Sequence, residues 1–198
     1  NQLKNVIFYE NSNLQKIEQR AFESSSLTSL IITSKSVQFD DESFINTPNL
    51  ATIKIPKDSI NYKSFDDDQF IFDKKSDVLI FANHAIDSLI VPSFTKKIGP
   101  YAFNHSKLES IIFPPNVTEI GYRSFYQSKN IKKIEFPENS ELNSIKNSAF
   151  EGSSLEYIKI PPKVEVIEED VFRECKKLKC IEFTNDSELQ TIEDNAIS

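Results

Sequence analysis

The chain repeats one short pattern of apolar residues at nearly constant intervals, and this periodicity constrains its fold more than any other feature. Each unit opens on an aliphatic residue in a stretch of the form LxxIxI, and successive starts are 24, 23, 36, 22, 23, 24 and 23 residues apart. The starting residues are Leu3, Leu27, Leu50, Ile86, Leu108, Ile131, Leu155 and Leu178. Because a unit this short cannot bury its own apolar face, the copies must stack side by side and share a core.

Alternating apolar residues mark the start of each unit as a short strand. The residues three and five places after the start are apolar, as in Ile111 and Phe113 or Ile158 and Ile160. This alternation is typical of a half-buried strand. Proline often follows at once, as at Pro114 and Pro161, where it removes a backbone donor and ends the strand.

A phenylalanine recurs later in each unit, five residues after a second apolar pair. The members of this column are Phe22, Phe44, Phe65, Phe103, Phe125, Phe150 and Phe172, and Ile197 takes the place in the last unit. The column predicts an aromatic spine along the stack.

The units differ in the loop that follows the strand. Some units continue through PPNV or PPKV, whereas ENSNL (10–14), ENSEL (138–142) and NDSEL (185–189) are two residues longer in this interval. An insertion that preserves the residues on both sides belongs in a loop.

The one irregular step, from Leu50 to Ile86, contains FIFDKKSDVLIFA over residues 70–82. Two alternating runs around a polar turn predict a strand–turn–strand insert at 66–85. A linker between two domains is less favoured because the stretch is too apolar. We therefore expect one domain over 1–198, with about eight units.

The stretches LESIIFPPNVTEIGYRSF (108–125) and SLIVPSFTKKIGPYAF (88–103) resemble the BspA-like type of leucine-rich repeat. The resemblance covers nearly the whole chain outside 66–85. It implies a leucine-rich-repeat solenoid: a right-handed curved superhelix with a parallel sheet on the concave face, and turns with short strands or 3-10 segments on the convex side. The family occurs in surface proteins of host-associated bacteria and anaerobic protists, is linked to adhesion, and carries no catalytic motif. The low glycine content, and serine where the family often has cysteine after the phenylalanine, depart from its common pattern.

Composition argues against several functional classes. The net charge of −7 provides no basic footprint for nucleic acid. No apolar run approaches the roughly 20 residues of a membrane span, and three glycines leave little to build a nucleotide-binding loop. No clustered nucleophile, base or metal-ligand set is visible, so we expect a non-enzymatic protein without cofactor or metal.

The cysteines and histidines are expected to have structural roles and no catalytic or metal-binding role. Cys175 falls in a column of small residues and is expected to be buried, whereas Cys180 falls on the outward side of its strand, so no disulfide is expected. His84 lies in the insert and His105 in a predicted solvent-facing turn, and neither is expected to bind metal or act as an acid or base.

Acidic residues and glycosylation sequons leave alternatives open. The acidic run at 66–68, with Asp73 and Asp77, favours a solvated turn over a calcium site because it lacks a turn glycine. Sequons occur at Asn104, Asn116 and Asn185, and matter only in a glycosylating, secreting host.

The outward positions of the strands form the candidate binding surface, predicted to be the concave face. These positions, two and four residues after each start, include Ile7, Ile31, Lys54, Ile90, Ile112, Lys133, Glu135, Tyr157, Lys159 and Glu182. Exposed isoleucines in several of the first five units predict a contiguous apolar patch for a partner. The alternative is that β-branched residues simply favour strands and that the insert covers some of them.

The leading hypothesis is a protein-binding module, an adhesin or host-recognition domain that is secreted or on the cell surface and binds a host cell-surface or matrix protein. The alternative is an intracellular, cytoplasmic interaction scaffold of the same fold. Since the chain opens on Asn1, we expect a mature protein or a fragment. The last unit lacks a polar cap, which predicts either further repeats or self-association through an open end.

Overall fold

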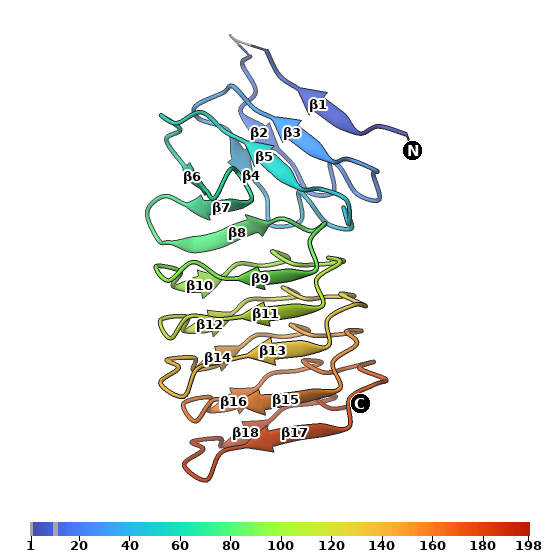
Figure 1. Cartoon of the computed structure of the whole chain (residues 1–198), viewed down its shortest axis with the longest axis vertical. Coiled ribbons are helices and arrows are strands. Elements are labelled where there is room, and N and C mark those ends of the chain that lie inside the picture. The colour runs from blue at the N-terminus through green and yellow to red at the C-terminus, as the bar shows by residue number, and fades with distance from the viewer. Residues whose placement is uncertain (1, 10–11) are drawn as a thin grey trace.

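The computed structural model, which describes residues 2–9 and 12–198, is a solenoid of stacked strands and turns (Figure 1). The described residues contain no helix, and therefore none that is long and apolar enough to cross a membrane. About eight coils follow one another along the long axis, as the periodicity predicts. The expected solenoid with parallel strands is thus confirmed, whereas its handedness and the curvature of its faces stay predictions.

The predicted strands form one wall of the solenoid, which we call the strand face. Alternation buries one row of side chains, such as Ile53, Ile111 and Ile158, and turns its neighbours outward. The strands are β1 (Asn5–Ile7), β3 (Ser29–Ile31), β5 (Thr52–Lys54), β9 (Ser88–Ile90), β11 (Ser110–Ile112), β13 (Lys133–Glu135), β15 (Tyr157–Ile160) and β17 (Cys180–Phe183). They pair in parallel within three separate sheets, ordered β1-β3-β5, β9-β11-β13 and β15-β17.

Shorter strands, formed where the second apolar pair lies, line an adjoining wall. They are β2 (Lys16–Ile17), β4 (Gln38–Phe39), β10 (Lys97–Ile98), β12 (Glu119–Ile120), β14 (Ser144–Ile145), β16 (Val166–Ile167) and β18 (Thr191–Ile192). β2 pairs with β4, and a single parallel run has the order β8-β10-β12-β14-β16-β18. This second wall is therefore continuous where the strand face is broken.

The irregular step folds into three antiparallel strands, β6 (Tyr62–Phe65), β7 (Phe70–Asp73) and β8 (Val78–Ala82). The strand–turn–strand over 70–82 is present, and β6 adds a strand before it. Both faces of β7 are buried: Phe70 and Phe72 belong to the core of the C-terminal units, and Ile71 to that of the N-terminal units. A strand buried on both faces reads as a continuous apolar run, which explains the sequence FIF.

The phenylalanine column is present, with one exception. Phe103, Phe125, Phe150 and Phe172 are fully buried, and their successive rings stack 4.8 to 5.5 Å apart. Phe65 was wrongly placed in this column: it is 47% exposed because β6 draws it into the antiparallel hairpin. Its ring packs edge-on against Phe94.

The turns around the phenylalanine column use left-handed backbone, mostly at residues other than glycine. In most coils the residues two before and two after the phenylalanine have positive φ, as at Arg123 (50°) and Gln127 (54°) around Phe125. Gly152 is the only glycine among the described residues that does so. Left-handed backbone costs a side-chain-bearing residue about 1–2 kcal/mol, and the ladder that joins each turn to the next offsets this, for example Gln127 N–H to Glu151 C=O at 2.8 Å.

Candidate functional site

The outward isoleucines of the strand face lie in two pairs. Ile7 stands opposite Ile31 on neighbouring strands β1 and β3, and Ile90 stands opposite Ile112 on β9 and β11. Three of the four are well exposed, with Ile90 at 72%, and Ile31 is half-buried. Each pair therefore offers adjacent apolar side chains on a rigid sheet.

The insert separates the two pairs, so the expectation of one continuous apolar row is not met. β5 ends the first sheet and β9 begins the second. On the far side of β5, the N–H of Ile53 donates to the carbonyl of Asp68 in the turn between β6 and β7 (3.4 Å). The turn between β6 and β7 thus lies beside β5, and the insert lies between the coils of β5 and β9 (Figure 1). Lys54 is exposed at this border.

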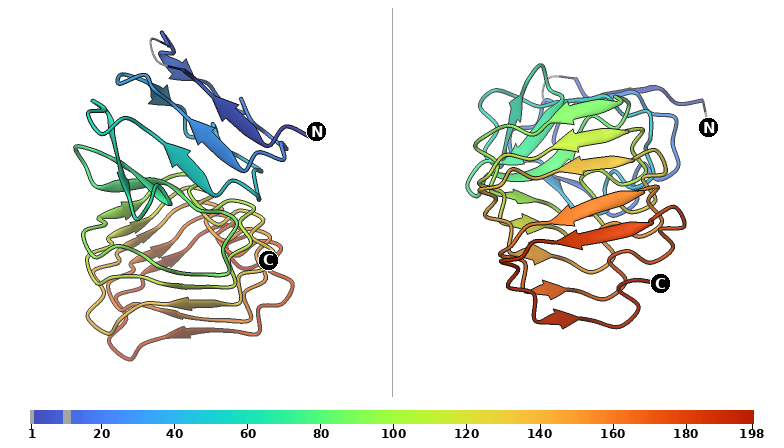
Figure 2. Two further views of the ribbon diagram at one scale, coloured as in Figure 1. Left: turned by 45° about the horizontal axis from the view of Figure 1, so that its top comes forward. Right: turned by 60° about the horizontal axis from the view of Figure 1, so that its bottom comes forward.

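The outward residues of the last three repeat strands are polar and paired. Lys133 and Glu135 form an ion pair on β13 (2.7 Å). On β15 and β17, the Tyr157 hydroxyl donates to the Glu182 carboxylate (2.6 Å), and the Lys159 ammonium lies 3.2 Å from its other oxygen. The hydrogen bond from Tyr157, followed by that from Lys159, lowers the pKa of Glu182. All ten residues expected on this face lie on its strands, and Figure 2 shows those strands from two directions.

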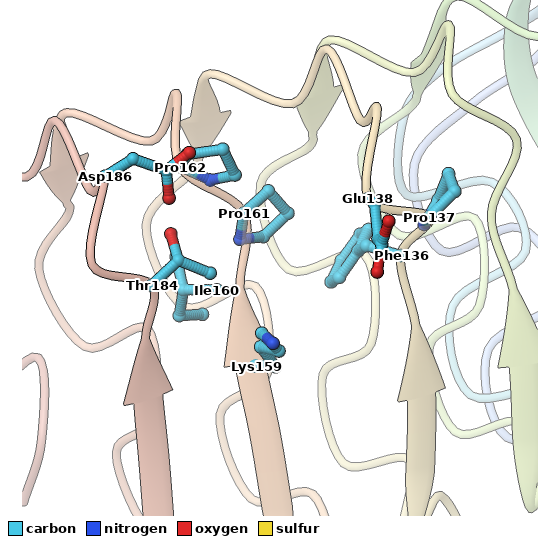
Figure 3. A pocket seen from close by; sticks show the side chains of 9 residues that line it. All are labelled: Phe136, Pro137, Glu138, Lys159, Ile160, Pro161, Pro162, Thr184 and Asp186. Atoms are coloured by element: carbon cyan, nitrogen blue, oxygen red, sulfur yellow. The ribbon is translucent and has the colours of Figure 1, made fainter.

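A pocket of about 350 Å³ opens beside Lys159, where the repeat strands run into their loops. Three consecutive coils line it, through residues 136–138, residues 159–162, and Thr184 with Asp186 (Figure 3). Its volume falls within the usual range of ligand pockets, about 300–1,000 Å³. It is a candidate binding site at the edge of the strand face.

The pocket coincides with a second break in the strand face. β13 and β15 are neighbours, yet no ladder hydrogen bond joins them. The loop with PPKV (161–164) here lies between the two longer loops at 138–142 and 185–189. A long loop reaches back to the preceding short loop, as Glu188 N–H does to Pro162 C=O (2.7 Å). No backbone hydrogen bond joins the PPKV loop to the long loop before it.

Sequence reasoning missed most of the pocket residues. Only Lys159 was expected at a site, because repeat position assigns Glu138, Thr184 and Asp186 to loops without saying what they face. The sequence feature that could have indicated a pocket was the order of loop lengths in the last three coils, which is long, short and long.

The remaining singled-out residues have structural roles. Cys175 is buried and Cys180 exposed, and both are free, as their positions predicted. His84 is fully buried between two coils, with ring nitrogens 3.0 Å from the Ala102 carbonyl and 3.2 Å from the Thr47 carbonyl. Burial lowers its pKa to about 4. His105 is half-buried rather than solvent-facing, since its ring packs against Tyr126.

The structure also shows the conformation of the acidic run at 66–68 and the exposure of the sequon asparagines. Asp66, Asp67 and Asp68 form a tight left-handed turn. Within residues 2–9 and 12–198, no group of three or more His, Cys, Asp or Glu side chains is arranged to hold a metal ion. Asn104 is fully buried, with its amide group hydrogen-bonded at both ends, whereas Asn185 is exposed. Asn104 is therefore not accessible for glycosylation in the folded chain.

The solenoid is similar to several solved bacterial structures. A leucine-rich repeat protein from Eubacterium ventriosum is 20% identical with a TM-score of 0.79, over 96% of this chain and 54% of that one. A leucine-rich cell surface protein from Faecalibacterium prausnitzii is 27% identical with a TM-score of 0.64, over 86% of this chain and 52% of that one. The pneumococcal vaccine antigen PcpA is 17% identical with a TM-score of 0.53, over 96% and 62%.

The chain thus spans about half the length of the first two of these proteins. The sequence matches none of the curated proteins compared with it. The family described as BspA type leucine rich repeat region matches in six copies, over residues 1–72 and 77–198. The chain therefore belongs to the BspA-type leucine-rich repeat family.

Proposed function

We propose that residues 1–198 act as one non-enzymatic protein-binding module whose strand face is the contact surface. The observation that carries this proposal is the exposed Ile90–Ile112 pair beside the charged residues of β13, β15 and β17. An apolar centre that excludes water next to polar groups that fix orientation is the usual anatomy of a protein interface. Because parallel strands hold these side chains in place, little conformational entropy is lost on binding.

We propose further that the module is displayed at a cell surface or secreted, where it binds a host cell-surface or matrix protein. The support is family membership and similarity to a Faecalibacterium prausnitzii structure that is described as a cell surface protein. An intracellular scaffold of the same fold is the competing function. Occupied sequons at Asn116 or Asn185 in native material would contradict it.

The test compares two sets of exposed isoleucines. Ile90→Ser with Ile112→Ser removes the apolar pair, and Ile60→Ser removes an isoleucine that is 60% exposed but lies off the strand face, between β5 and β6. Binding to a panel of purified matrix proteins and to intact epithelial cells is measured after circular dichroism has shown that each variant is folded.

We expect binding to fall about tenfold or more in the double variant, because each interface anchor contributes about 1–2 kcal/mol. Ile60→Ser should bind like the unmodified chain. Equal binding by all three proteins would refute the proposed contact surface.

Self-association through the open C-terminal end stays a separate prediction. Ile192 is 49% exposed and Ile197 52% exposed at this end. Light scattering over a range of concentrations distinguishes monomer from oligomer.

A further inference from the structure

We propose that the pocket between β13 and β15 binds an arginine side chain of the protein partner. This inference rests on the proposed function, since the pocket borders the strand face that would contact the partner. It specifies one subsite and the chemistry that the subsite recognises.

The pocket combines an apolar base with hydrogen-bond acceptors. Phe136, Ile160 and Pro161 provide hydrocarbon surface, and the latter two are buried. Glu138 from one long loop and Asp186 from the other contribute carboxylates (Figure 3). The side-chain oxygen of Thr184 is buried without a hydrogen-bond partner. A ligand that brings several N–H donors on an aliphatic stem matches this combination of acceptors and hydrocarbon.

The charges of the neighbouring residues show which carboxylates are available. Lys159 is held by Glu182 at 3.2 Å, and Lys163 by Glu141 at 2.6 Å. In the part of the chain that the structure describes, neither Glu138 nor Asp186 forms an ion pair. Residues 131–198 carry 15 Asp and Glu against 9 Lys and Arg, a balance of −6. The pocket therefore attracts a cation, because its one lining lysine, Lys159, and the nearby Lys163 are each paired with a glutamate.

Arginine fits these features better than lysine. Its planar guanidinium presents five donors and stacks on flat surfaces such as proline and aromatic rings, whereas the lysine ammonium is compact and strongly hydrated. Its three-carbon stem can lie along the apolar base while the charged head remains near the rim. Because the pocket continues from the ends of β13 and β15, a partner segment crossing the strand face could reach it.

The test uses the full chain labelled with ¹⁵N and a short probe, acetyl-Gly-Arg-Gly-amide. The matched probe replaces arginine with citrulline, which keeps the shape and removes the charge. We expect saturable shifts of the backbone amides of Glu138, Ile160, Thr184 and Asp186 with the arginine peptide. Citrulline should produce no saturable shifts there, and salt should weaken arginine binding.

Two double variants make the assignment specific. Glu138→Gln with Asp186→Asn neutralises the rim, whereas Glu165→Gln with Asp194→Asn removes the same charge at exposed positions outside the pocket. We expect the Kd for the arginine peptide to rise about tenfold or more in the first pair, because charge-assisted hydrogen bonds are lost. The second pair should change it by less than about threefold.

Each outcome decides the inference. It fails if no saturable shifts appear up to about 10 mM peptide, a range that covers a Kd of ~1 mM. It also fails if citrulline binds equally well or if the rim variant binds like the unmodified chain. If the Ile90 and Ile112 variant loses partner binding but the unmodified chain binds no arginine peptide, only this inference is refuted. If the chain binds the arginine peptide but the isoleucine variant binds the partner as well as the unmodified chain does, only the proposed function is refuted.

Discussion

The N-terminal coils, residues 3–55, and the C-terminal coils, residues 86–198, use the same unit but pack to different degrees. In the C-terminal coils the phenylalanine rings stack 4.8 to 5.5 Å apart in the buried core. In the N-terminal coils Phe22 and Phe44 are 6.2 Å apart, and Phe22 is only half-buried. Close ring stacking is therefore a feature of the longer uninterrupted run of coils, whereas the shorter N-terminal run has a wider ring separation.

Polar contacts join the two groups of coils where the column is interrupted. The Asn104 side chain accepts a hydrogen bond from the Asn46 backbone at 2.7 Å and donates to the Tyr101 carbonyl at 2.6 Å. The Tyr101 hydroxyl donates to Glu42 at 2.8 Å. This hydrogen bond adds to burial in raising the pKa of Tyr101. Specific side-chain contacts thus replace the backbone ladder that joins coils elsewhere.

The largest expected effect comes from breaking the regular part of the column. Phe125→Ala should lower the free energy of unfolding by about 3–5 kcal/mol, because it removes a fully buried ring and leaves a cavity. Phe65→Ala, at the exposed position, should cost about 1 kcal/mol or less. Urea unfolding followed by circular dichroism measures both, and equal losses would contradict the contrast between them.

His84 should make the junction sensitive to acid. Its pKa is about 4 in the folded chain and about 6.5 when unfolded, so the unfolded state binds the proton more tightly between these values. His84 therefore does not reduce the free energy of unfolding above pH 6.5. As the pH drops through this window, the free energy of unfolding falls by on the order of 3 kcal/mol. Urea unfolding at pH 7, 6, 5 and 4 should show a steeper loss in the unmodified chain than in His84→Gln. Parallel curves would show that His84 is not responsible.

Asn104 tests how much one side-chain bridge contributes. Asn104→Ala should cost about 1–3 kcal/mol, because the partly buried backbone amide of Asn46 loses its acceptor. Asn185→Ala, at an exposed sequon, is the matched control and should change stability by less than about 0.5 kcal/mol. Thermal unfolding of the two variants would disprove the bridging role if their midpoints fell together.

The smallest effect concerns the left-handed turns of the C-terminal coils. Gln127→Gly should raise stability by up to about 1 kcal/mol, because glycine accepts the φ of 54° without a steric cost. Gly152→Ala should lower stability, since its φ is 67° and a Cβ there would overlap the Gln127 side chain. Chemical denaturation measures both, and a destabilised Gln127→Gly would indicate that the Gln127 side chain contributes more than the strain it introduces.

The sequence predicted the repeated elements well because their signals are local. Alternating residues such as Ile111 and Phe113 specify a strand within a few positions, and the spacing of Phe103, Phe125 and Phe150 specifies which rings meet. Phe65 was misplaced because its spacing suits the column, whereas its environment depends on pairing with β7. Spacing along the chain could not reveal that competing partner.

By itself, the sequence determined the stacking unit, the shared core and the outward row of side chains, since a short unit has only one way to bury its apolar face. Only the tertiary structure decided where the strand face is interrupted. The insert divides Ile31 from Ile90, and unequal loops accompany a pocket between β13 and β15. Both features depend on which backbone groups of neighbouring coils reach one another, and that is a property of the assembled stack rather than of any single unit.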